Sequence, residues 1–158
     1  MARIVDTIVR DAAGALGACA PHLRSPGGEV SSWIVEPAGM LNEASRGCFV
    51  TAALARFITA QVEALMKRVF PDGKYIYVHD FSRISGYEPR ARRILTDWGI
   101  SRRREVETIV VVTSPSNAIV RMGVSTAAAV LRARGVDIHV ADSLAEVVRA
   151  HGIRPARI

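Results

Sequence analysis

The sequence predicts one α/β domain in which a four- to five-stranded, mostly parallel or mixed sheet is covered by helices. Three observations support this. A chain of 158 residues suits a single hydrophobic core. Apolar residues recur at three- and four-residue steps in some segments, whereas others are short runs rich in β-branched residues. These two kinds of segment alternate, and such alternation favours right-handed crossovers between parallel strands.

The first 28 residues are expected to form an amphipathic helix and a loop. Apolar side chains fall on one helical face from Ile4 to Cys19, and prolines and glycines up to Gly28 favour the loop. An edge strand over residues 3–9 is the alternative. We therefore divide the chain into residues 1–28 and an α/β domain over residues 29–158. Because an exposed apolar stripe needs cover, this segment either joins two copies into a homodimer or packs on its own sheet.

The remaining elements follow from periodicity and from turn residues. Strands are predicted at residues 33–35, 74–80, 108–113 and 136–141. Helices are predicted at residues 51–69, 89–98 and 117–134, and a last one begins at Ser143. Pro89 fits the first position of its helix, with Glu88 as a cap. We interpret Gly123 as a break in the third helix that packing requires, rather than as an anion site.

Composition and charge exclude several classes of function. The formal charge of +6 would attract nucleic acid. Lysine occurs only at Lys67 and Lys74, however, and an arginine bias of this kind can follow from genomic base composition, so we expect no nucleic-acid partner. Cys19 and Cys48 have no CxxC spacing and the histidines have no metal-ligand spacing, so we expect two reduced, buried thiols, no metal and no cofactor. No apolar run is long enough for a signal peptide or a membrane span, which favours a cytoplasmic protein.

Several local sequences have counterparts in one family. The segment 39–42 (GMLN) is similar to a G-x-L-D turn before a first helix, and residues 80–84 (DFSRI) are similar to a D-L-S-x-V segment. Residues 114–122 and the ending ADSLAEVVRA also have counterparts. In this order, over residues 31–151, the chain resembles the STAS domains of bacterial anti-sigma-factor antagonists.

The chain departs from that family at its phosphorylation site. Phospho-switching members carry a D-S-S-G-like sequence at a helix start, and the matching residues here are Glu88-Pro89-Arg90-Ala91. Both serines are absent, and neither proline nor arginine accepts a phosphate. Ser82 and Ser85 lie in the preceding loop and could substitute, but we interpret them as loop hydroxyls that satisfy backbone groups.

The resemblance implies a non-enzymatic signalling or scaffold module whose protein partner is a regulator or is kinase-like. The loop and helix after the central strand combine an exposed tyrosine with arginines, and both residue types anchor protein interfaces. The candidate partner-binding residues are Ser82, Arg83, Ser85, Tyr87, Glu88, Arg90 and Arg93. A solvated, non-functional helix face is the competing interpretation.

Two other functions remain open. A small-ligand or lipid-binding domain related to the core of CRAL-TRIO domains would use the apolar residues of the 51–69 and 117–134 helices. An enzyme would use His79 and Asp80 at the end of a strand, where α/β folds place ligands. Adjacent strand residues point to opposite faces, and no Gly-x-Ser-x-Gly nucleophile turn follows, so we expect no catalysis.

Overall fold

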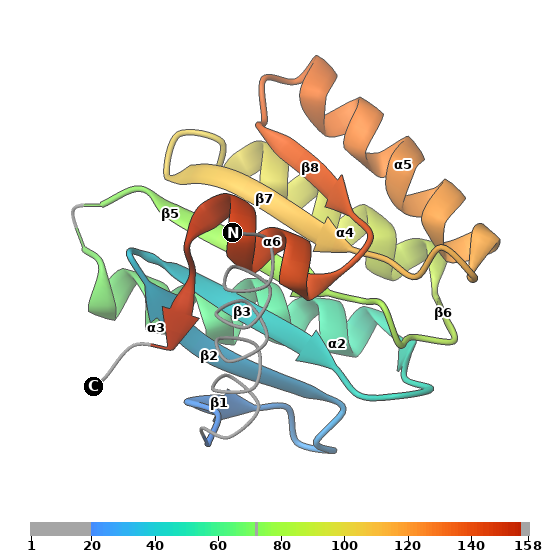
Figure 1. The fold of residues 1–158 in the computed structure, drawn as a ribbon, viewed down its shortest axis with the longest axis horizontal. Helices are drawn as coiled ribbons and strands as arrows, with labels where there is room; N and C mark the ends of the chain where they lie inside the picture. The colour runs from blue at the N-terminus through green and yellow to red at the C-terminus, as the bar shows by residue number, and fades with distance from the viewer. Residues whose placement is uncertain (1–19, 72, 156–158) are drawn as a thin grey trace, which may run out of the picture.

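The computed structural model describes residues 20–71 and 73–155. Cys19 and the helix or edge strand predicted near the N-terminus lie outside the described residues, so their prediction stands as made. The described chain forms three layers, a sheet between helices on both of its faces (Figure 1). The predicted α/β class is confirmed, and the sheet is mixed.

The main sheet has the order β1-β2-β3-β5-β7-β8, and β9 also pairs with β2. Strands β1 to β3 are antiparallel, whereas β3, β5, β7 and β8 are parallel. A separate pair of two-residue strands, β4 and β6, is parallel. The sheet is wider than predicted because β1 and β9, two residues each, extend it beside β2. The strands are β1 (Leu23–Arg24), β2 (Val30–Glu36), β3 (Gly39–Ala44), β4 (Phe49–Val50), β5 (Tyr75–Asp80), β6 (Gly86–Tyr87), β7 (Val106–Val112), β8 (Ile138–Ala141) and β9 (Arg154–Pro155).

Two local predictions on the N-terminal side are wrong. The segment predicted as a turn, residues 39–42, lies inside β3, which pairs with β2 on one side and β5 on the other. Its glycine allows close strand pairing, since a Cβ at Gly39 would lie 2.7 Å from the carbonyl oxygen of Ile76. The segment predicted as a loop contains β1, and the Ile34 N–H donates to His22 Nδ1. The sheet therefore starts before the boundary predicted at residue 28.

The four helices predicted within the described residues are all present. One continuous helix comprises α2 (Ala52–Phe57), the π-helical turn η1 (Ile58–Val62) and α3 (Glu63–Val69). It lies with α4 (Pro89–Ser101) and α5 (Ala118–Ala133) on one face of the sheet, and α6 (Leu144–His151) covers the other (Figure 1). The predicted break at Gly123 is wrong, because α5 runs through it without interruption.

The buried side chain of Glu63 joins α3 to α4. It accepts hydrogen bonds from Trp98 Nε1 at 2.6 Å and from Arg102 Nε at 3.1 Å, and it pairs with Lys67 at 2.9 Å. Burial alone would raise the pKa of Glu63, but these donors and cations outweigh burial and lower it. Trp98 also packs edge-on against Tyr77 of β5, so this cluster fixes α4 relative to the sheet.

Candidate functional site

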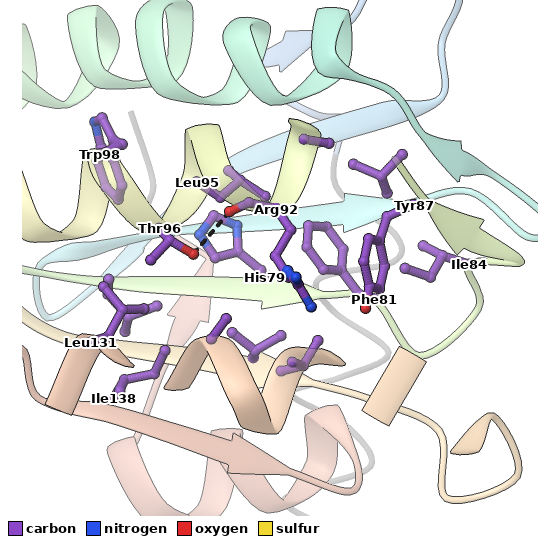
Figure 2. Close-up of a pocket in the computed structure, with 16 residues that line it drawn as sticks. His79, Phe81, Ile84, Tyr87, Arg92, Leu95, Thr96, Trp98, Leu131 and Ile138 are labelled. Carbon is purple, nitrogen blue, oxygen red and sulfur yellow. Dashed lines mark hydrogen bonds between the residues drawn. The ribbon is translucent and has the colours of Figure 1, made fainter. Parts of the chain in front are cut away.

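A cavity of about 70 Å³ lies between the sheet and helices α4 and α5. Its walls are mostly apolar and include Ile109 from β7, Leu95 from α4 and Leu131 from α5. Figure 2 shows His79 among these side chains, with Tyr87 and Arg92 on one side of the cavity. An open volume surrounded by apolar side chains is typical of sites that bind small molecules.

His79 is the buried polar group on the cavity wall. The side chain is 5% exposed. Its Nδ1 lies 3.4 Å from Nδ2 of Asn42. The Oδ1 atom of Asn42 in turn accepts a hydrogen bond of 2.7 Å from Ser32 Oγ. The three residues occupy paired positions on β2, β3 and β5. Because the amide Nδ2 can only donate, Nδ1 of the imidazole accepts and the proton of the neutral ring lies on Nε2.

The environment of His79 favours the neutral imidazole. Burial lowers its pKa to about 4, since the surroundings solvate a charged ring poorly. The ring lies between Tyr77 and Phe81, with centroid distances of 5.9 and 5.5 Å. Among residues 20–71 and 73–155, His79 has no hydrogen-bond partner other than Asn42. Its Nε2–H is therefore a donor without a partner beside an apolar cavity.

Tyr87 and Arg92 border the cavity from β6 and α4. Tyr87 is half-buried rather than exposed as predicted, and its ring packs on the α5 backbone. A Cβ at Gly123 would lie 1.4 Å from the Tyr87 hydroxyl oxygen, so glycine is required here for close packing. The Arg92 guanidinium carbon lies 6.0 Å from the centroid of the Tyr87 ring, at the limit of a cation–π contact.

The two loop serines use their hydroxyls within the loop. Ser82 Oγ donates to Asp80 Oδ1 at 2.6 Å, and the Ser82 N–H donates to the same oxygen at 3.1 Å. Ser85 Oγ lies 3.0 Å from the carbonyl oxygen of Gly47 and 3.2 Å from that of Cys48. These contacts agree with the interpretation of both serines as structural loop hydroxyls. Arg83, in the same loop, forms a 3.8 Å ion pair with Glu43.

Glu88 has a structural role that the sequence did not reveal. It occupies the N-cap position of α4, but its side chain makes no capping bond there. Instead, Glu88 Oε2 accepts a hydrogen bond of 2.7 Å from the N–H of Ala52, the first residue of α2. The Glu88 N–H donates to the carbonyl of Val50. The predicted cap therefore stabilises the start of a different helix, and it joins the starts of α2 and α4.

Arg90 and Arg93 are exposed, as Arg83 and Ser85 are, but unlike those two they have no partner among the described residues. Both are exposed on the first turns of α4, and neither forms an ion pair with any residue of the described chain. With Arg92 they form what we call the arginine face, Arg90, Arg92 and Arg93. The first turn of α4 has no acidic residue, although the positive end of the helix dipole favours one.

His79 and Asp80, the residues considered for catalysis, make different contacts. His79 faces the cavity, whereas the Asp80 carboxylate binds Ser82 in the loop, and no hydrogen bond joins His79 to Asp80. Within the described ranges, no group of three His, Cys, Asp or Glu side chains is placed to hold a metal ion. Cys48 is buried as predicted, and burial raises the pKa of its thiol.

Comparison with known proteins adds no relative. No family model matches the chain, and no curated protein or solved structure matches it either. Helices in the part of the chain that the structure describes lack the combination of length and apolar composition needed to cross a bilayer. The function is therefore argued from the residues of the site.

Proposed function

We propose that this chain is a non-enzymatic, STAS-like signalling or scaffold module that binds an acidic surface of a protein partner through the arginine face. The observation that carries the proposal is the pair of unpaired arginines, Arg90 and Arg93, at the start of α4. The partner is a regulator or a kinase-like protein, as the resemblance to anti-sigma-factor antagonists implies.

Helix electrostatics explain why these arginines indicate a partner. A cation near a helix N-terminus opposes the positive end of the dipole, and the opposition is worth about 0.3–1 kcal/mol per charge at an exposed site. Neither Arg90 nor Arg93 forms an ion pair within the described residues that would offset this cost. An acidic partner would offset it and would be guided to the site by the positive charge.

A groove beside the arginine face offers apolar contacts to the same partner. It lies between α4 and α5 and has a volume of about 210 Å³. Its lining comprises Pro89, Arg92, Arg93, Thr96 and Asp97 of α4 and Thr126, Ala127 and Val130 of α5. Val130 is 46% exposed. Arginine beside exposed apolar side chains is typical of protein interfaces.

The proposed binding does not depend on phosphorylation of this helix. The positions that carry serines in phospho-switching STAS domains carry Pro89 and Arg90 here. The hydroxyls of Ser82 and Ser85 are held inside the loop. Positive charge at the helix start suits recognition of an acidic group on the partner rather than acceptance of a phosphate.

Affinity capture with charge-reversed variants tests the proposal. The purified chain is used as bait in extract of the source cells, and recovered proteins are compared between the wild type and the double variant Arg90→Glu/Arg93→Glu. The matched control is Arg103→Glu/Arg104→Glu, which reverses two exposed arginines beyond the other end of α4. We expect a partner that the wild type and the control recover and the arginine-face variant loses. Equal recovery by all three baits would refute the proposal.

The lipid-binding alternative receives less support from the cavity. Pockets for drug-sized ligands have volumes of about 300–1,000 Å³. The cavity beside His79 measures about 70 Å³, too little to enclose an acyl chain. A CRAL-TRIO-like lipid carrier would therefore need a different arrangement of α4 and α5, whereas a much smaller ligand would not.

A further inference from the structure

We propose that the cavity between α4, α5 and the sheet binds a small organic acid, whose hydrocarbon part fills the apolar interior and whose oxygen atoms accept hydrogen bonds from His79 Nε2 and Arg92. This site shares Arg92 with the arginine face but does not include Arg90 or Arg93, and its ligand is a small molecule rather than a protein. Figure 2 shows both donors beside the apolar side chains of the cavity.

The proposal rests first on the Nε2–H of His79, a donor without a partner among the described residues. His79 is 5% exposed and lines the cavity, and side-chain donors in such surroundings normally have a hydrogen-bond partner. The chain maintains this arrangement, because the Asn42 amide, which accepts a hydrogen bond from Ser32, contacts Nδ1 of His79 through its Nδ2 and so directs the proton to Nε2. A bound oxygen atom would supply the missing acceptor, and an apolar residue in place of His79 would have avoided the problem.

The charge of the lining indicates an acid rather than an amine or a neutral compound. Arg92 is the charged residue of the lining, which contains no carboxylate. Its guanidinium forms no ion pair within residues 20–71 and 73–155. Thr96 of α4 also lines the cavity, but its hydroxyl already donates a hydrogen bond to the backbone oxygen of Arg92. An occupant therefore meets the unpaired donors of His79 and Arg92, of which Arg92 is cationic, and a carboxylate matches both.

The volume limits the size of that acid. An engineered apolar cavity of about 150 Å³ accommodates benzene, a molecule of six carbons. By that scale, the cavity of about 70 Å³ accommodates about three carbon atoms, the size of the hydrocarbon part of a short acid. Propionate, butyrate and isobutyrate fall within this range, with the carboxylate at the open side near Arg92. A long-chain fatty acid would leave most of its chain in water.

Calorimetric titration with a panel of compounds tests the site. The wild-type chain is titrated with isobutyrate, butyrate, octanoate and isobutyramide, the last being the uncharged counterpart of isobutyrate. We expect saturable binding of the two short acids, and affinity for isobutyramide weaker by at least about tenfold because the charge-assisted hydrogen bonds are lost. Octanoate should bind no better than butyrate.

Three variants locate the binding. Arg92→Gln removes the charge, and Ala127→Leu fills the cavity from α5 without changing either donor. Both should weaken isobutyrate binding by at least about tenfold, whereas Arg104→Gln, an exposed arginine away from the cavity, should not. Circular dichroism confirms that each variant is folded. No binding by the wild type, equal binding of acid and amide, or unchanged binding by Arg92→Gln would each overturn the proposal. None of these results would affect capture of a protein partner by Arg90 and Arg93.

Discussion

Acidification should destabilise this fold through His79, because the folded chain keeps its imidazole neutral. The pKa of His79 is lowered to about 4 by burial, compared with 6.5 for an ordinary histidine. Between these two values the unfolded chain binds a proton that the folded chain does not bind. The stability associated with the neutral ring is therefore fully present above pH 6.5, and it is lost as the pH falls toward 4.

The size of the effect follows from the two pKa values. With a folded-state pKa of about 4 and an unfolded-state pKa of 6.5, the chain should lose about 2 kcal/mol of unfolding free energy between pH 8 and pH 5. The full loss, reached below pH 4, is about 3 kcal/mol. A loss of this size is a large fraction of the stability of an ordinary domain.

Urea denaturation, followed by circular dichroism, measures this loss at pH 8 and pH 5. The wild type is compared with His79→Gln, whose side chain can still accept from Asn42 but does not titrate. His139→Gln, at an exposed histidine, is the matched control. Titration of Glu63 and Glu43 is common to all three proteins and cancels in the comparison. We expect the wild type and the control to lose about 2 kcal/mol more than His79→Gln.

Equal pH dependence in the wild type and His79→Gln would refute this explanation. It would mean that the buried imidazole is accessible to water, or that it finds an acceptor for its second proton when charged. A smaller loss in His139→Gln than in the wild type would instead assign part of the effect to the protein surface.

Three further substitutions test the packing around the site by the same denaturation assay at neutral pH. Gly123→Ala should reduce stability by about 1–3 kcal/mol, although alanine favours a helix by about 1 kcal/mol, because the new methyl group collides with Tyr87. In a Tyr87→Ala background the same change should be neutral or stabilising, and a loss there would contradict the collision. Glu63→Gln should cost about 1–3 kcal/mol and shift the fluorescence of Trp98, whose N–H loses a charged acceptor. Since its donors and cations lower the pKa of Glu63, the contribution of this carboxylate should be complete above pH 4.5 and should be lost in stronger acid. Glu88→Ala should cost about 0.5–2 kcal/mol through the start of α2, and no change would exclude the cross-helix cap.

The sequence predicted those helices and strands whose own residue pattern is typical of the element that they form. Apolar periodicity predicted the helix from Ala52 to Val69, and the valine-rich run predicted β7. The same reasoning missed β3, because Asn42 is a residue type typical of turns. In the structure its side chain is fully buried. Only pairing with β2 and β5 supplies the partners that make an amide acceptable inside a strand.

The exposed arginines of the candidate site were predicted and the cavity was not, because only the arginines have a local signal in the sequence. Arg90 and Arg93 were correctly placed on an exposed helix start, since the position of Pro89 fixes the beginning of α4. The cavity was not predicted, because its walls come from segments far apart in the chain. The pairing of Tyr87 with Gly123 had only one local signal, a glycine in the middle of an otherwise regular helical pattern. Such a glycine indicates close approach of another group as well as a break.

The two proposed sites meet at Arg92, which borders both the cavity and the groove beside the arginine face. A carboxylate held by Arg92 would neutralise one of the three charges that the arginine face presents to an acidic partner. Linkage then requires the effect to be mutual: if the acid weakens partner binding, the partner weakens acid binding by the same factor. A module whose helix start cannot accept a phosphate would in this way still have a local change of charge, supplied by a ligand rather than by a kinase.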